Sequence, residues 1–575
     1  MMKRIYLILI LAMPLVMACE DFIDRPPLDQ ISTNDYWKSS ADLQNYTAQF
    51  YLDFVEGHDG IPSASVRYEE NSDNIVSTGV NNLLSGRVTP ATGTWKSQWE
   101  IIRTINIFFD NYSRCEDDFS TWQHYLGEAQ FFKAYHYFQL VKRYGDVPWY
   151  THSLMPDDEE LMKARNPRTQ VVDSLLILLD QAFVNISGRN DAPWGNNSIN
   201  KEAVLAFKTR VALFEGTWQK YHAMLNDQFS TPGANPDKYF QACVDAAEEL
   251  MNGNYRVGIY NTGNPETDYF DLFSMSNMGS IDEVLLYKAY NIDEGYGHNA
   301  NFYATTYPFG YGTTWSYVTS HLGRDGDSFD YLGLAETTKG NDFMVAIANN
   351  CDPRLHQNVW IPGEVISSIS NIVWDKPPID EGGAFQNSSG FQFRKYTNTT
   401  QTLNYADEND QGFIIFRYAE VLLNYAEAKY ELDGVVAYEQ LNQLRARAGM
   451  PDFTIIPQST DPNRLDYGYS IPDELYEIRR ERRVETVFEG LREMDWRRWA
   501  AHALFTGKRF KGYPFKQDEF PELTVHLDEN GLIDILQSLI PNGNQFRPNQ
   551  DYLYSIPLQE LTLNPNLEQN PGWDN

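Results

Sequence analysis

The clearest helical pattern in the chain is WQHYLGEAQFFKAYHYFQLVKRY, residues 122–144. The stretch lacks proline. Its apolar side chains recur every three or four residues, as on one face of an amphipathic helix: Leu126, Ala129, Phe132, Tyr135, Phe138 and Val141. Phe131 and Tyr137 widen this face, so we expect the helix to be buried on more than one side. Gly145 and Pro148 follow it, which is typical of a helix C-terminus.

Four further stretches predict helices. Asn200 is a candidate N-cap for a helix that runs to about Trp218, and another helix is expected over residues 237–251. The apolar faces over residues 419–430 and 437–448 are separated by Asp433-Gly434, which predicts an antiparallel hairpin. Such hairpins resemble tetratricopeptide-type repeats, without a clean period of ~34 residues. We therefore predict an all-α fold of tetratricopeptide-like helical hairpins.

Residues 254–411 have a different composition: Gly, Asn, Asp, Ser and Tyr dominate, and apolar runs are short. This composition indicates long loop-rich inserts with a few short strands, and loops of such length are usually functional. We divide the chain into a signal peptide (1–18), a tether (19–38), an N-terminal helical region (39–253) and a loop-rich C-terminal region (254–575). The last two are expected to pack into one domain.

The N-terminus indicates export. Lys3 and Arg4 precede an apolar stretch of 14 residues, too short to span the ~30 Å of hydrocarbon in a membrane as a helix, which favours a signal peptide. Val16-Met17-Ala18-Cys19 fits a bacterial lipoprotein box and predicts a lipid anchor on Cys19. The alternative is ordinary cleavage after Ala18, with Cys19 as an incidental thiol. Glu20 and Asp21 look like the acidic signal that some Gram-negative lipoproteins use to reach the cell surface.

The composition is globular, acidic and rich in aromatic residues. The formal charge of −33 argues against a non-specific nucleic-acid binder, because phosphate contacts need a basic surface. Aromatic residues make up 14% of the chain, including 36 Tyr and 13 Trp. Tyr and Trp in such numbers suit a wet recognition surface. The acidity favours neutral, hydroxyl-rich ligands over anions.

The sequence lacks the usual signatures of catalysis and metal binding. It contains no HExxH helix, no Gly-x-Ser-x-Gly elbow and no Walker A loop. The acidic stretches 324–330 and 407–410 could hold a structural calcium ion through oxygen ligands, but we favour solvated loops and predict no cofactor. The Arg-rich run RRERRVE, residues 479–485, interleaves Glu with Arg. We interpret it as an internal ion-pair network rather than a polyanion site.

Several motifs occur in a shared order along the chain, and together they resemble the SusD/RagB family of nutrient-binding outer-membrane lipoproteins. They are CEDFID (19–24), LGEAQ (126–130) with GDVP (145–148), RYAEVLLNYAEA (417–428), LRARAG (444–449), IRRERR (478–483), and the C-terminal IP (556–557), NPNL (564–567) and QNPGW (569–573). The resemblance covers the chain from residue 19 to residue 573. These motifs are scaffold elements and say little about the ligand.

The resemblance implies a helical SusD-like fold and a role in polysaccharide utilisation without covalent chemistry. It implies a lipoprotein on the outer face of the Gram-negative outer membrane. There it would capture oligosaccharide or polysaccharide and act as a hinged lid on a SusC-like TonB-dependent transporter. It implies no enzyme activity, and the acidic composition predicts no nucleic-acid partner.

Two loop regions are candidates for the glycan site, because sugar rings pack on Trp and Tyr while their hydroxyls bind polar side chains. Residues 71–95 offer Asp73, Arg87 and Trp95; residues 290–317 offer Tyr296, Tyr307 and Trp315. The family often places binding groups in these regions. The alternative for each residue is loop packing. Trp99 is expected to face the core, and Trp360 and Trp374 are further candidates.

Two alternatives remain open from the sequence. One is a surface glycoside hydrolase, since paired catalytic carboxylates are neighbours in space and leave no sequence spacing to search for. The other is a family member that captures peptides instead of sugars.

Overall fold

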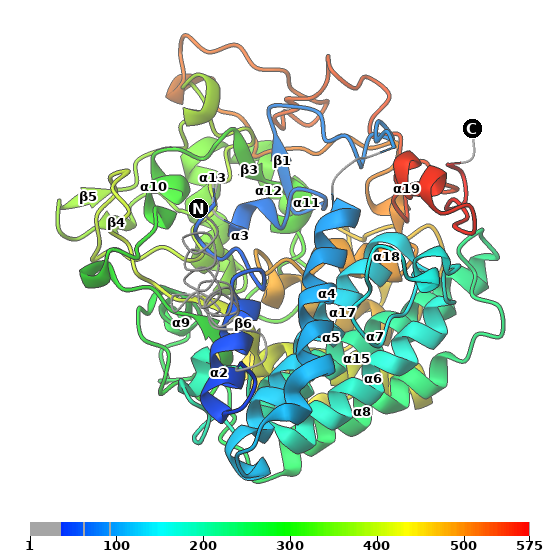
Figure 1. The fold of residues 1–575 in the computed structure, drawn as a ribbon. Helices are drawn as coiled ribbons and strands as arrows, with labels where there is room; N and C mark the ends of the chain where they lie inside the picture. The colour runs from blue at the N-terminus through cyan, green and yellow to red at the C-terminus, as the bar shows by residue number, and fades with distance from the viewer. Residues whose placement is uncertain (1–35, 61–63, 91–93, 574–575) are drawn as a thin grey trace, which may run out of the picture.

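The computed structural model describes residues 36–60, 64–90 and 94–573. Long helices gather on one side of the molecule, and short helices, strands and loops form the other (Figure 1). The all-α prediction is confirmed. Cys19, the signal peptide and most of the tether lie outside the described residues, and the division at residue 253 stays a prediction. No helix within the described ranges has the length and hydropathy that a membrane crossing requires.

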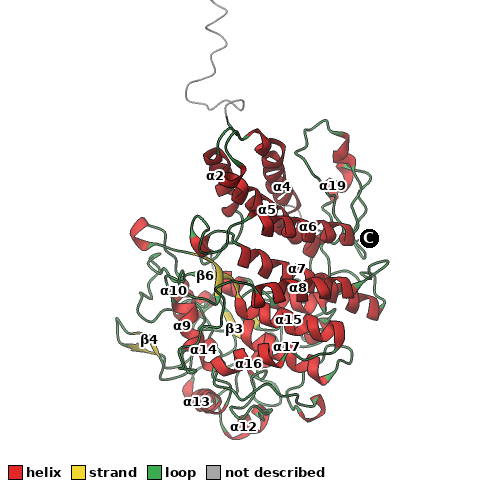
Figure 2. Cartoon of the chain, turned by 90° about the horizontal axis from the view of Figure 1, so that it is seen from below, coloured by secondary structure: helices red, strands yellow, loops and turns green. Residues whose placement is uncertain are grey.

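The helical side is a stack of antiparallel layers. Figure 2 shows α5 beside α6, α7 beside α8, and α15 beside α17 in succession. The helices of this side are α2 (Ser40–Ala48), α4 (Thr94–Asn111), α5 (Phe119–Tyr144), α6 (Arg168–Asn185), α7 (Lys201–Leu225), α8 (Pro236–Asn252), α15 (Tyr418–Asp433), α16 (Tyr438–Arg447), α17 (Asp473–Thr486), α18 (Arg492–Arg498) and α19 (Leu558–Leu563).

The predicted helix ends are largely confirmed by their caps. The side chain of Asn200 accepts a hydrogen bond from the backbone nitrogen of Ala203 at the start of α7, which satisfies a donor that has no partner within the helix. α5 ends at Gly145 with φ of 71°, and α15 ends at Gly434 with φ of 75°. α7 continues to Leu225, beyond the expected end near Trp218, because its burial continues through Tyr221 and His222.

The loop-rich side contains more helix than the sequence predicts. Its elements are α3 (Ala64–Arg67), α9 (Asp268–Ser274), α10 (Ala300–Thr305), α11 (Trp315–Val318), α12 (Tyr331–Thr337), α13 (Gly340–Asn350), α14 (Arg354–Asn358), β1 (Ile75–Ser77), β2 (Val284–Lys288), β3 (Tyr311–Thr313), β4 (Val365–Ser367), β5 (Ile372–Val373) and β6 (Phe413–Arg417). Helices this short gain stability from tertiary packing rather than propensity. In α13, for example, Phe343, Met344 and Ile347 are buried in a second hydrophobic core.

Strand pairing joins distant parts of the chain. The strands form three antiparallel pairs, β1 with β3, β2 with β6, and β4 with β5. The β2–β6 pair places Tyr287 opposite Ile414, and β6 leads directly into α15. The loop-rich side is thereby attached to the helical stack at the point where a large cleft opens.

Candidate functional site

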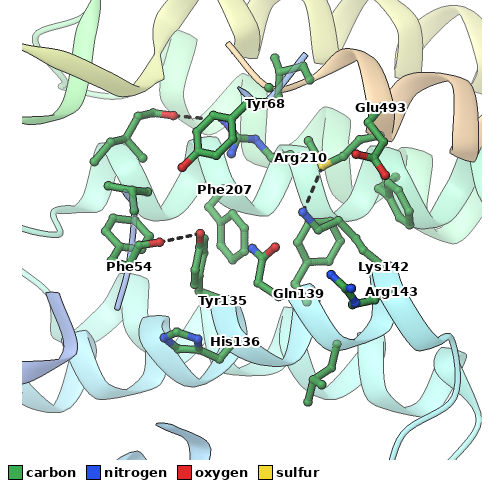
Figure 3. Close-up of a pocket in the computed structure, with 18 of the residues that line it drawn as sticks. Phe54, Tyr68, Tyr135, His136, Gln139, Lys142, Arg143, Phe207, Arg210 and Glu493 are labelled. Carbon is green, nitrogen blue, oxygen red and sulfur yellow. Dashed lines mark hydrogen bonds between the residues drawn. The ribbon is translucent and has the colours of Figure 1, made fainter. Parts of the chain in front are cut away.

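A cavity of about 530 Å³ lies between the helical stack and the loop-rich side. Its volume falls within the ~300–1,000 Å³ range of small-molecule sites. Figure 3 shows its lining side chains, which come from α5, α7, β6, α18 and the loops around residues 54 and 68. We call it the central cleft. Its polar and charged lining includes Tyr68, Asn71, Tyr135, Gln139, Lys142, Arg143, Arg210, Glu493 and Arg497.

Helix α5 supplies one wall of the central cleft. Tyr135, Gln139, Lys142 and Arg143 lie on neighbouring turns of one helix face (Figure 3). The Tyr135 hydroxyl donates a hydrogen bond to the carbonyl oxygen of Phe54 at 2.8 Å, which holds its ring in place. Toward its C-terminus, α5 therefore presents a row of polar groups to the cleft. The helical period of its apolar residues does not predict this row.

The cations of the central cleft fall into two groups. Arg210 forms a bidentate pair with Glu420 at 2.6 and 2.7 Å, and Arg497 lies 2.8 Å from Glu493. By contrast, the Lys142 ammonium lies 3.5 Å from the Met494 sulfur and 5.2 Å from the centroid of the Phe138 ring. Burial lowers the pKa of Lys142 to about 8; Arg210 and Arg497 also lower it, while Glu493 raises it.

Arg143 is the second cation of the cleft without a carboxylate partner. Its guanidinium carbon lies 4.0 Å from the centroid of the Tyr554 ring, a cation–π contact. Its Nε is buried and lacks a hydrogen-bond partner among the described residues. Among the described residues, no carboxylate lies within ion-pair distance of Lys142 or Arg143.

A second candidate surface lies on the loop-rich side, around α10. Tyr307 packs edge-on against Phe385 with 4.5 Å between ring centroids, and it stacks on Phe302 at 5.3 Å. Phe385 is 45% exposed and Tyr405 57% exposed. We call this surface the aromatic patch; it consists of Phe302, Tyr307, Phe309, Phe385 and Tyr405.

A shallow pocket of about 330 Å³ adjoins the aromatic patch and shares Phe385 with it. Trp374 forms part of its wall, with its ring stacked on Trp360 at 6.0 Å between centroids. Asp375 and Glu381 expose their carboxylates at the same pocket. Flat rings beside free hydrogen-bond acceptors can bind a sugar through both its C–H face and its hydroxyls.

The structure disperses the predicted residues of the 290–317 region. Tyr307 belongs to the aromatic patch. Tyr296 is 44% exposed but stacks on Tyr290 at 5.1 Å, and its hydroxyl donates to Asp59 at 3.2 Å, apart from the patch. Trp315 is half-buried in the first turn of α11, with its ring 5.7 Å from that of Phe343. A binding role for each of the three stays a prediction.

Two candidates of the 71–95 region, Trp95 and Asp73, are buried, and Trp95 lies in a helix rather than in the expected loop, so its binding role stays a prediction. Trp95 is 4% exposed in the first turn of α4 and packs on Tyr144, and Trp99 is partly buried and packs against the core, as expected. Trp95 lines a separate, largely apolar groove between α4 and α19. Arg87 is exposed and lines neither the central cleft nor the patch, so its role stays a prediction.

Asp73 is a scaffold residue because it neutralises two buried guanidiniums. Its carboxylate lies 2.7 Å from Arg492 and 3.0 Å from Arg483. Burial alone would raise the pKa of Asp73, but the two arginines outweigh burial and hold it well below its usual range. A carboxylate bound so tightly within the protein has no acceptor left to offer to a sugar.

The ion-pair interpretation of residues 479–485 is confirmed. Glu485 on α17 binds Arg354, Arg417 and Arg447, and Arg482 binds Asp495 at 2.8 Å. These side chains are all buried. Elsewhere, the described residues contain no group of three or more His, Cys, Asp or Glu side chains arranged to hold a metal ion. A structural calcium ion at residues 324–330 or 407–410 stays untested.

Comparisons with known proteins agree on one family. A model described as "SusD family" matches residues 215–573, and one described as "Starch-binding associating with outer membrane" matches residues 22–213. The chain is similar to SusD-like protein P2 of Formosa agariphila, with 22% identity and 100% of each chain covered. It also resembles SusD-like protein P38 of the same organism, with 22% identity over 85% of this chain and 89% of the relative.

Solved structures show the same fold. A SusD-like carbohydrate-binding protein from Bacteroides fragilis matches with a TM-score of 0.72 and 22% identity, covering 92% of this chain and 99% of that one. Another SusD-like protein from Bacteroides fragilis matches with a TM-score of 0.72 and 21% identity, covering 95% and 100%. At these identities the likeness concerns the fold.

Proposed function

The chain belongs to the SusD family, since a model of that family matches more than half of its length, and on this premise we propose that it is a non-catalytic, glycan-binding lipoprotein of the cell surface. It captures oligosaccharide or polysaccharide and delivers it to a SusC-like TonB-dependent transporter in the outer membrane. The family membership and the names of its relatives support this role, as does the exposed aromatic patch.

The aromatic patch is the observation that carries the glycan assignment. Exposing a cluster of aromatic rings to water is unfavourable. Such a cluster beside polar acceptors is therefore typical of a binding surface rather than of loop packing alone. Phe385 and Tyr405 present their rings to solvent, and Asp375 and Glu381 expose carboxylates at the adjoining pocket. Sugar hydroxyls can donate to these carboxylates while the ring packs on an aromatic face.

We expect the purified protein to retain polysaccharide without changing it. Affinity electrophoresis against starch, mannan, galactan, xylan, glucuronoxylan and a sulfated galactan measures retention. A reducing-end assay on the same mixtures measures turnover. Slower migration in at least one gel with no new reducing ends supports capture. Reducing ends that rise with time and follow a bell-shaped pH profile would establish a glycosidase instead.

The same gels, together with calorimetry on peptides, distinguish a peptide-capturing protein from a glycan-binding one. A protein that migrates freely through every polysaccharide gel, but binds a mixture of oligopeptides in calorimetry, is a peptide-capturing member of the family. Retention by polysaccharide with no heat from peptides supports the glycan role. Free migration in every gel with no heat from peptides contradicts capture of either kind.

The proposed anchor is tested on Cys19, which lies outside the described residues. We expect Cys19→Ala to move the protein from the outer-membrane fraction to the soluble fraction, because stable anchoring requires the acyl chains. Wild-type protein solubilised in detergent should copurify with a TonB-dependent barrel. Membrane association that survives the substitution contradicts the lipid anchor, and purification without any barrel contradicts the transporter partnership.

A further inference from the structure

Two cationic side chains point into the central cleft without an anionic partner. Lys142 contacts the Met494 sulfur at 3.5 Å, and Arg143 stacks on Tyr554. The other cations of the cleft are paired: Arg210 with Glu420, Arg497 with Glu493, and Arg67 with Glu56. The unpaired positive charge is thus confined to one wall of the cleft, the last turns of α5 (Figure 3).

An unpaired cation in a cleft is unfavourable for the empty protein. Taking an ammonium group partly out of water costs free energy that a thioether sulfur, a weak acceptor, does not return. An apolar side chain would fill the same position at lower cost. Groups that weaken the fold while they face a cavity are typical of binding sites, where the missing partner arrives with the ligand.

The alternative role of Lys142 and Arg143 is structural: they would stabilise the negative, C-terminal end of the α5 helix dipole. Cations in a last helical turn do this. Side chains that extend into water interact with the helix dipole equally well. The dipole therefore does not explain why Lys142 and Arg143 lie in a cavity. Gln139, one turn earlier on the same face, likewise has no side-chain hydrogen bond among the described residues and adds neutral hydrogen-bonding capacity beside the two cations.

We propose that the central cleft binds a single anionic substituent, a carboxylate or a sulfate ester, carried by an otherwise neutral oligosaccharide. Lys142 and Arg143 pair with the anion, and Gln139 binds neighbouring hydroxyls. The inference rests on the proposed function for its saccharide class.

The formal charge of −33 disfavours polymers with an anion on every sugar. Charges farther away than about 8–10 Å are screened by salt. The binding energy of a single anion in the cleft therefore depends mainly on the nearby cations.

The test compares two acidic polysaccharides with their neutralised forms, glucuronoxylan against carboxyl-reduced glucuronoxylan and sulfated galactan against desulfated galactan. We expect at least one acidic form to bind roughly tenfold or more tightly than its neutral form, as suits a charge-assisted hydrogen bond. Lys142→Gln and Arg143→Gln should each remove most of that difference. Lys96→Gln is the matched control, because it removes one exposed charge outside the cleft.

Equal binding of acidic and neutral forms by the wild type overturns the proposal while leaving glycan capture intact. Lys142 and Arg143 variants that keep the full preference for the acidic form also overturn it. Binding of carboxylate-terminated peptides, lost on C-terminal amidation and in Lys142→Gln, would assign the anion to a peptide and overturn the saccharide class. Failure of every polysaccharide to bind contradicts the proposed function itself.

A second measurement needs no ligand. If Lys142 serves a ligand rather than the fold, Lys142→Met should melt at the wild-type temperature or above it, because methionine fills the site without a buried charge. A melting temperature lowered by several degrees would make Lys142 a structural residue and overturn the proposal. The variant thus remains informative even where no glycan is at hand.

Discussion

Replacing Glu485 with glutamine is expected to lower the free energy of unfolding by about 3–5 kcal/mol. Glu485 is fully buried on α17 and is shared by three guanidiniums, with Arg354 at 2.9 Å, Arg417 at 2.7 Å and Arg447 in closer contact. Burial alone would raise the pKa of Glu485, but the three arginines outweigh burial and hold it well below its usual range. Glutamine keeps the shape and removes the charge, so the cost measures the loss of one carboxylate shared by three buried guanidiniums, each of which keeps another carboxylate partner.

The matched control for Glu485→Gln is an exposed ion pair. Lys238 lies 2.6 Å from Asp173, with side chains 48% and 38% exposed. Lys238→Gln should cost no more than about 1 kcal/mol, because exposed pairs gain little in water. Urea denaturation of the three proteins gives the comparison through midpoint and slope. Equal stability of the Glu485 variant and the control would mean that the buried network holds no net stabilisation at this position.

The position of Glu485 gives this network its role in the fold. Arg354 lies in α14 of the loop-rich side, Arg417 at the end of β6, and Arg447 at the end of α16. One carboxylate therefore joins the loop-rich side to the helical stack. The central cleft opens beside this junction, and Glu489, which lines the cleft, also binds Arg417. A loss of charge at Glu485 should loosen the cleft as well as the fold.

The long helices and the existence of an ion-pair network could be predicted from the sequence because their signals are local, although the partners of Glu485 are distant in sequence. The period of α5, the cap at Asn200 and the interleaved Glu and Arg of α17 each lie within a few turns of one helix. The short helices of the loop-rich side could not be predicted in the same way. Each has only a few turns and is stabilised by contacts that are distant in sequence.

The candidate surfaces were only partly predictable for the same reason. Tyr307 was recognised as a loop aromatic, whereas its neighbours Phe385 and Tyr405 lie far along the chain and reach it through tertiary folding. The sequence offers Asp73 as a polar loop residue, and it carries no sign of Arg483 and Arg492, which are distant in sequence and bind its carboxylate. Lys142 and Arg143 look like an ordinary helix C-terminus in sequence. Only the cavity in front of them indicates a second role.

The double variant Phe385→Ala with Tyr405→Ala is expected to weaken polysaccharide binding at least 100-fold. Truncating a central aromatic contact costs about 2 kcal/mol or more, and each 1.4 kcal/mol corresponds to about a factor of ten in affinity. The two rings touch different members of the aromatic patch, Tyr307 and Phe302, so their effects should be nearly additive. Both side chains are exposed, and the melting temperature should therefore change little.

Tyr438→Ala is the matched control for the aromatic patch. Tyr438 is 47% exposed, close to the 45% of Phe385, but it lies in α16 on the helical side. Its removal deletes an equally exposed ring and should leave binding unchanged. Calorimetry on the polysaccharide that is best retained gives the three affinities. If the double variant binds like the wild type while Lys142→Gln does not, the glycan lies in the central cleft alone. The exposed rings would then belong to the packing of α10 and its neighbouring loops.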